Sequence, residues 1–161
     1  MTGRKQAPIV QWVLVADAAQ ARLFRRDTDA DPLVQIDTVA HPATHLRPSA
    51  GDGDRPGHGS SDRHVGGVSF EPRVEPHRKE HRRFARELAE RLERAAERRE
   101  YARLSIYAPP EFLGDLRAEL GAATRQRLGL ARDLDLCAYG LDELEKRIAQ
   151  AEHEARRSAP T

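Results

Sequence analysis

Cysteine is nearly absent from this sequence: Cys137 is the only one among 161 residues. An intrachain disulfide and a zinc site built from several cysteines are therefore excluded. The neighbouring residues Leu136 and Ala138 are apolar, which predicts a packed thiol rather than a nucleophile. A run of about 18 apolar residues is also missing, so the sequence predicts no membrane-spanning helix.

A large net charge is missing as well, because the 27 lysines and arginines are nearly balanced by 26 aspartates and glutamates. The overall charge therefore gives no argument for a nucleic-acid or membrane partner. Lysine is scarce and occurs only as Lys5, Lys79 and Lys146, so nearly all the cations are arginines. In such an arginine-biased composition, a cluster of arginines is a weaker sign of function than usual.

The glycine patterns of nucleotide-binding loops do not occur in this sequence. The G-x-S-x-G turn of serine hydrolases is absent too, and the closeness of Ser60, Asp62 and His64 along the chain does not make a catalytic triad. We therefore expect no cofactor, and the sequence favours a protein that is not an enzyme.

The amino-terminal segment imitates a secretion signal, since Arg4 and Lys5 precede an apolar stretch over residues 9–16. Gln11 and Asp17 interrupt that stretch, and cleavage after it would remove the best strand of the chain. We therefore expect a cytoplasmic protein.

Three strands joined by tight turns are predicted at residues 12–16, 21–26 and 33–39. The first is continuously apolar, which is typical of a central strand covered on both faces. Asp17 is interpreted as the turn residue that follows it. The third strand alternates apolar Val34 and Ile36 with polar residues, which indicates an outer strand with one solvent-exposed face.

The regular pattern stops over residues 41–78, where glycine, proline, serine, aspartate and histidine dominate. A loop of this length is uncommon in a compact domain and is usually functional or disordered. Up to residue 77 it holds four arginines against five acids, so it is not a simple cationic arm. We expect a long mobile loop here.

Helices and strands alternate after the loop: helix 79–99, strand 104–108, a helix starting near Pro110, strand 128–133 and a helix from residue 141. The apolar spacing predicts the buried faces of these helices. Their expected core residues are Phe84, Ala85, Leu88, Ala89, Leu92, Ala95, Ala96, Phe112, Leu113, Leu116, Leu120, Leu144, Ile148 and Ala151.

This order of elements predicts one α/β domain over residues 1–161. A strand meander (9–40) is followed by the loop (41–78) and by a helix-strand-helix-strand-helix unit (79–155). The later strands must enter parallel, through helical crossovers. The expected sheet is five-stranded and mixed, with the first strand near its middle and helices on both faces.

Several short motifs occur along the chain in a fixed order. They are Trp12-Val13-Leu14-Val15-Ala16-Asp17, Ala21-Arg22-Leu23-Phe24, Gly53-Asp54-Arg55-Pro56-Gly57, Arg63-His64, Glu80-His81, Arg83-Phe84-Ala85-Arg86-Glu87-Leu88-Ala89 and Ala108-Pro109-Pro110-Glu111-Phe112-Leu113-Gly114. Together they resemble a family of bacterial proteins labelled "required for attachment to host cells", from about Trp12 to Ile148.

That family is itself similar to the middle domain of archaeal and eukaryotic peptide-release factors, whose topology is like that of ribonuclease H. In those factors the loop before the first long helix carries Gly-Gly-Gln, which positions water on the peptidyl-tRNA ester. The equivalent loop here holds Gly66-Gly67-Val68, and no glutamine lies between Gln35 and Gln126. The resemblance therefore implies a related fold and ribosome or RNA partners without release-type hydrolysis.

Metal chemistry is the enzymatic alternative. His77, Glu80 and His81 match the H-x-x-E-H pattern of a class of zinc proteases. Pro76 directly precedes them, so His77 is expected before the helix or in its first turn, and no third ligand can be assigned. Solvated histidines are therefore the default interpretation. A two-metal nuclease centred on Asp17 is disfavoured because the fourth strand ends without an acid.

The leading hypothesis is a non-catalytic protein that binds RNA or the ribosome through a flexible loop and the arginine-rich start of the first long helix. Helix amino termini and arginines both suit phosphate groups. The expected phosphate contacts are Arg55, Arg63, Arg78, Lys79, Arg82, Arg83 and Arg86. The expected loop elements are Gly57, His58, His64, Gly66 and Gly67.

The first alternative is a host-attachment or envelope-related factor that binds other proteins. The second is a metal-dependent hydrolase that uses His77, Glu80 and His81.

Overall fold

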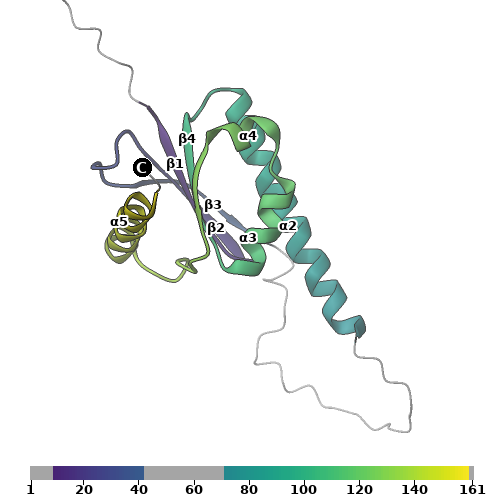
Figure 1. Ribbon diagram of the computed structural model, residues 1–161. Coiled ribbons are helices and arrows are strands. Elements are labelled where there is room, and N and C mark those ends of the chain that lie inside the picture. Colours follow the sequence, from purple (N-terminus) through teal and green to yellow (C-terminus); the bar gives the residue numbers. More distant parts are fainter. Residues whose placement is uncertain (1–8, 42–70, 160–161) are drawn as a thin grey trace, which may run out of the picture.

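The computed structural model describes residues 9–41 and 71–159 (Figure 1). The elements in chain order are β1 (Gln11–Ala16), β2 (Gln20–Arg26), β3 (Val34–Ala40), α2 (Glu71–Glu97), β4 (Arg103–Tyr107), α3 (Pro110–Glu119), α4 (Ala122–Arg127), β5 (Leu128–Arg132) and α5 (Leu141–Ser158). No helix in the described ranges is long and apolar enough to cross a membrane.

The described strands form one five-stranded sheet in the order β3-β2-β1-β4-β5. β1 pairs antiparallel with β2 and parallel with β4, and β5 continues the parallel half. The mixed sheet with the first strand at its centre is confirmed. Residues 11–16 are all buried, as their unbroken apolar pattern predicts for a central strand.

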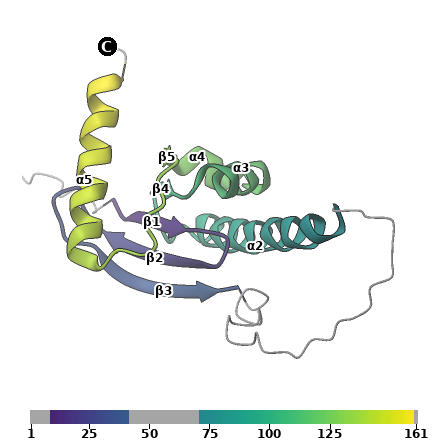
Figure 2. The ribbon, with the colours of Figure 1, turned by 90° about the horizontal axis from the view of Figure 1, so that it is seen from below.

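Helices cover both faces of the sheet: α2, α3 and α4 lie on one side and α5 on the other (Figures 1 and 2). One core lies under α2 and α3, and a second lies under α5. Every helical residue expected in the core is buried, from Phe84 and Leu88 in α2 to Leu144 and Ile148 in α5. The α/β class is therefore confirmed, whereas the closer likeness to the release-factor topology stays a prediction.

The boundary between the loop and the first long helix was predicted wrongly. α2 begins at Glu71 rather than at residue 79, so the last part of the expected loop 41–78 is helical. His77 consequently lies inside the helix and not before it. Proline has a backbone φ compatible with a helix, and near the helix start Pro76 removes only one internal hydrogen bond. It was a poor marker of the boundary for that reason.

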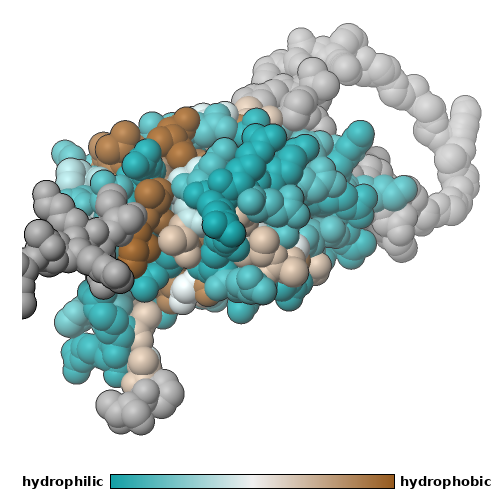
Figure 3. Space-filling model, turned by 90° about the horizontal axis from the view of Figure 1, so that it is seen from above, coloured by the Kyte–Doolittle hydropathy of each residue, from teal (hydrophilic) through white to brown (hydrophobic). Residues whose placement is uncertain are grey.

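The apolar side chains of the outer strand β3 are more exposed than its alternating pattern predicts. The strand lies at the sheet edge as predicted, but Val34 and Ile36 are 59% and 43% exposed. A register shift in the β2–β3 pairing falls beside Ile36, and α5 packs over β1, β2 and β4 instead. Hydrophobic residues gather toward one end of the face seen in Figure 3, while the rest of that face is mainly hydrophilic.

The turn that follows α2 contains the one non-glycine residue with positive φ among the described residues, Arg99 at 59°. Glu100 donates its backbone N–H to the carbonyl oxygen of Ala95 at 2.9 Å, which closes the helix. Glycine is the usual residue at such a left-handed position.

We expect Arg99→Gly to raise the free energy of unfolding by about 0.5–1 kcal/mol, because relief of the strained backbone exceeds the added flexibility of the unfolded chain. Urea unfolding measures this. Arg98→Gly, one position earlier, is the control and should destabilise. Equal losses in both variants would contradict the expectation.

Candidate functional site

The loop residues proposed for binding lie outside the described residues. They are Arg55, Gly57, His58, Arg63, His64, Gly66 and Gly67.

The arginines at the start of α2 face acids on the neighbouring helix α3. Arg78 pairs with Glu111 and with Asp115, the latter at 3.1 Å. Arg86 lies 3.5 Å from Glu119 of the same helix. The local surplus of positive charge seen in the sequence is therefore offset in space by α3. These two guanidinium groups bridge α2 and α3 at the surface.

Three further cations of this group are exposed. Arg83 is 70% exposed and only 4.0 Å from Glu80 within its own helix. Lys79 and Arg82 form no ion pair with any described residue. Of the predicted phosphate contacts in the described ranges, these three are the ones whose charge is most available to a ligand.

The histidine motif in α2 does not gather into a metal site. His77, Glu80 and His81 form no compact set of three ligand atoms in the described part of the chain. Glu80 instead lies 3.2 Å from Nε2 of His41, which is 3% exposed and stacks on Phe84. Glu80 therefore contacts a buried ring at the end of β3.

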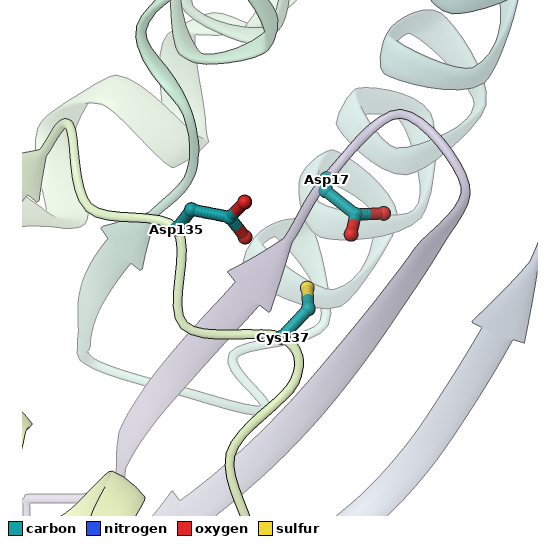
Figure 4. Close-up of side chains that lie close together, drawn as sticks. All are labelled: Asp17, Asp135 and Cys137. Atoms are coloured by element: carbon teal, nitrogen blue, oxygen red, sulfur yellow. The ribbon is translucent and has the colours of Figure 1, made fainter.

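A different group of potential ligands lies where β1 ends (Figure 4). Asp17, Asp135 and Cys137 bring two carboxylates and a thiol within 4.8 Å of one another. Asp17 follows β1, whereas the other two lie in the segment between β5 and α5. The sequence did not reveal that these three side chains lie together, because their proximity depends on the path of the segment between β5 and α5 past the end of β1.

The contacts of Asp17 in this cluster show that it stabilises the turn between β1 and β2. One carboxylate oxygen of Asp17 accepts hydrogen bonds from the backbone N–H groups of Ala19 and Gln20, both at 2.8 Å. The predicted turn function of Asp17 is therefore confirmed. Burial, and then the nearby negative charges of Asp17 and Asp135, raise the pKa of the Cys137 thiol well above its usual range. The thiol is protonated at neutral pH and is a poor metal ligand without prior deprotonation.

We expect Cys137 to react with a thiol reagent far more slowly than a free cysteine at pH 7, because it is 6% exposed and carries a raised pKa. The rate should rise steeply only in the urea range where the protein unfolds. Stopped-flow labelling beside a circular dichroism unfolding curve measures both. Fast labelling of the folded protein would contradict a packed thiol.

A groove lies between α2 and the strand meander, on the face of the sheet opposite α5. Its volume is about 490 Å³. Its floor is apolar and includes Trp12 and Leu14 of β1, Leu23 of β2 and Val39 of β3. We call this the α2–β3 groove. It exists because α3 and α4 pack beside α2 toward β4 and β5, so that the meander side of α2 has no neighbouring helix among the described elements.

Arginines line the helical wall of the α2–β3 groove. Arg91 and Arg94 lie in the last turns of α2 and Arg98 directly follows the helix, and all three are exposed. Nη1 of Arg91 reaches across to Asp37 of β3 at 2.7 Å. Arg94 and Arg98 form no ion pair with any described residue. The exposed cations that lack acidic partners thus extend to the carboxyl end of α2, far from the helix start that the sequence singled out.

Sequence reasoning missed this groove, although a signal was present. The sequence repeats arginine at positions 91, 94 and 98 beside the apolar stripe of the predicted helix, and Asp37 stands on the strand predicted to be outermost. Only the order of strands and the placement of α2 show that these residues share one opening.

The fold and the groove define an α/β protein with an open groove between its first long helix and an antiparallel meander. A family model described as "Protein required for attachment to host cells" matches residues 12–148. The chain belongs to this family, as the motifs in its sequence suggested. None of the curated proteins matches the sequence.

Proposed function

We propose that this protein is a protein-interaction factor of the attachment family and that it binds its partner in the α2–β3 groove. The proposal rests on the α2–β3 groove itself, whose floor is apolar and whose edge carries exposed charged residues. Protein-binding sites typically combine an apolar centre with a polar rim. The family description, which concerns attachment, fits a protein that acts through a partner.

Site-specific photo-cross-linking tests this function. A photoreactive amino acid replaces Glu100, which lines the groove without belonging to its arginines, and in a matched control it replaces Arg157, an exposed residue of α5 on the opposite face. We expect protein adducts from position 100 that survive ribonuclease and are absent from position 157. Adducts that disappear with ribonuclease, or that form equally at both positions, would remove the proposal.

Binding of the ribosome or of structured RNA is a second candidate function. It is supported by the exposed cations Lys79, Arg82 and Arg83. Together with Arg55 and Arg63 they would contact phosphate oxygens, and the part of the loop over residues 51–67, which lies outside the described residues, would reach into the partner. A cytoplasmic location belongs to this proposal.

Co-sedimentation with ribosomes across a salt series tests this candidate. Phosphate binding predicts an affinity that falls steeply as salt rises. The double variant Lys79→Glu/Arg82→Glu should reduce both the affinity and its salt dependence, whereas Arg157→Glu should not. Absence of binding even at low salt would eliminate the RNA hypothesis.

A further inference from the structure

The most informative contact in the groove is the ion pair between Arg91 and Asp37, because it spans the opening between α2 and β3. Both side chains are about half exposed, at 52% and 44%. Ion pairs with this exposure contribute little to stability and exchange readily with other partners. The charged residues at the edge of the groove form its rim. The carboxylate of Asp37 is already accommodated at this point of the rim, and the carboxylate of a partner can replace it.

We propose that the α2–β3 groove receives an acidic, amphipathic segment of a partner protein. An apolar side chain of that segment enters the groove, and its carboxylates pair with Arg91, Arg94 and Arg98. The inference rests on the proposed protein-interaction function and adds the chemistry of the partner. In it, Asp37 is an internal substitute for the partner's acid.

The charges of the rim favour an acidic partner over a neutral or basic one. Three arginines line the groove against two acids, Asp37 and Glu100. Two of the three arginines, Arg94 and Arg98, are not neutralised by any described acid. Guanidinium groups bind carboxylates through paired hydrogen bonds, which gives an acidic segment geometric selectivity as well as attraction.

The floor of the groove favours a peptide side chain over a nucleic-acid base. Single-stranded nucleic acids are held by stacking on exposed aromatic rings. The aromatic residue in this groove, Trp12, is only 9% exposed, and its ring stacks on Tyr101 at a centroid distance of 4.7 Å. Half-buried Leu23 and Val39 offer aliphatic contact instead.

Synthetic peptides of matched length test the proposal by fluorescence anisotropy on the full chain. One peptide flanks a central Leu-Phe pair with glutamates, and two others carry glutamines or lysines at the same positions. We expect the acidic peptide to bind at least about tenfold more tightly than the glutamine peptide, which is equivalent to about 1.4 kcal/mol. The lysine peptide should not bind.

Variants of the rim give the decisive comparison. Arg94→Glu/Arg98→Glu should weaken the acidic peptide at least about tenfold, whereas Arg157→Glu on α5 should leave it unchanged. Asp37→Asn removes the competing internal carboxylate, so it should tighten binding by about two- to fivefold. Circular dichroism and thermal unfolding of each variant separate a lost contact from a lost fold.

Four results would overturn the inference. They are equal binding of the acidic and glutamine peptides, unchanged binding by Arg94→Glu/Arg98→Glu, no binding by any peptide, and a preference for anionic lipid vesicles over the acidic peptide. If cross-linking from position 100 still captures protein, the proposed function stands and only the partner chemistry is wrong. If cross-linking captures RNA alone, the proposed function itself fails.

Discussion

Replacing Glu152 with leucine is expected to lower the free energy of unfolding by about 3–5 kcal/mol, because it leaves the guanidinium group of Arg26 buried without its main charge partner. The side chains of Arg26 and Glu152 are 5% and 9% exposed. Arg26 also donates to Oε1 of Gln11 at 3.2 Å and lies 3.5 Å from Asp29. The pair connects β2 to α5.

A double variant separates a lost ion pair from a packing defect. Arg26→Met/Glu152→Leu removes both charges and should be less destabilised than Glu152→Leu alone, since a buried pair contributes little net stability over apolar residues. Urea unfolding followed by circular dichroism measures the difference.

Glu154 provides the control, because it lies on the same helix in a largely exposed contact with Arg132 at 3.5 Å. Glu154→Leu should change stability by no more than about 1 kcal/mol. A loss in Glu154→Leu as large as that in Glu152→Leu would show that the buried pair has no special importance.

The second large effect concerns Glu93, whose carboxylate holds the short helix α4. Its oxygens accept hydrogen bonds from the backbone N–H groups of Ala123 and Thr124 at 2.9 and 3.0 Å, and from the Thr124 hydroxyl at 2.8 Å. A Cβ atom at Gly121 would lie 2.4 Å from that carboxylate. An alanine at this position would therefore have to displace the carboxylate from its hydrogen bonds.

We expect Gly121→Ala to destabilise the protein by about 2–3 kcal/mol, because it displaces a charged acceptor from several hydrogen bonds at once. Glu93→Gln should cost about 1–3 kcal/mol, since the amide keeps only one acceptor oxygen. The two losses should not add in the double variant, because both act on the same contacts. Additive losses in denaturant unfolding would contradict this account.

The same carboxylate gives stability a pH dependence. Burial is the largest influence and raises the pKa of Glu93, but the hydrogen bonds from Thr124 and Ala123 together outweigh it, and the pKa lies below its ordinary value of 4.5. Its stabilising contribution is therefore complete above that value and is lost as the pH falls through the lower pKa of the folded state. Glu93→Gln should flatten this acid limb of the stability curve.

Patterns within single elements predicted most of the fold. The unbroken apolar stretch at residues 12–16 placed β1 at the centre, and the spacing of Phe84, Leu88 and Leu92 gave the buried face of α2. These features follow from local periodicity, which the sequence carries directly. The helix α4 was missed because its six residues show little apolar periodicity. It depends on Glu93 of α2, which is remote in the sequence but adjacent in space.

The candidate site was harder to predict, because its residues meet only in space. The acids that neutralise Arg78 and Arg86 lie on α3, so counting charge along α2 overstated the positive surface at its start. Arg91 and Asp37 are separated by a long stretch of chain and meet through the order of strands. The charges along one helix therefore indicate a binding surface only when the charges of the neighbouring helix are counted with them.

The placement of α5 has a practical consequence. This helix packs through Leu144, Ile148 and Ala151 on the sheet face opposite the α2–β3 groove, and its final turns continue past the strands (Figure 2). Immobilising the protein on a sensor chip through an affinity handle after α5 would leave the groove open to the flowing analyte. Coupling through groups near β3 would block the opening that the measurement is meant to sample.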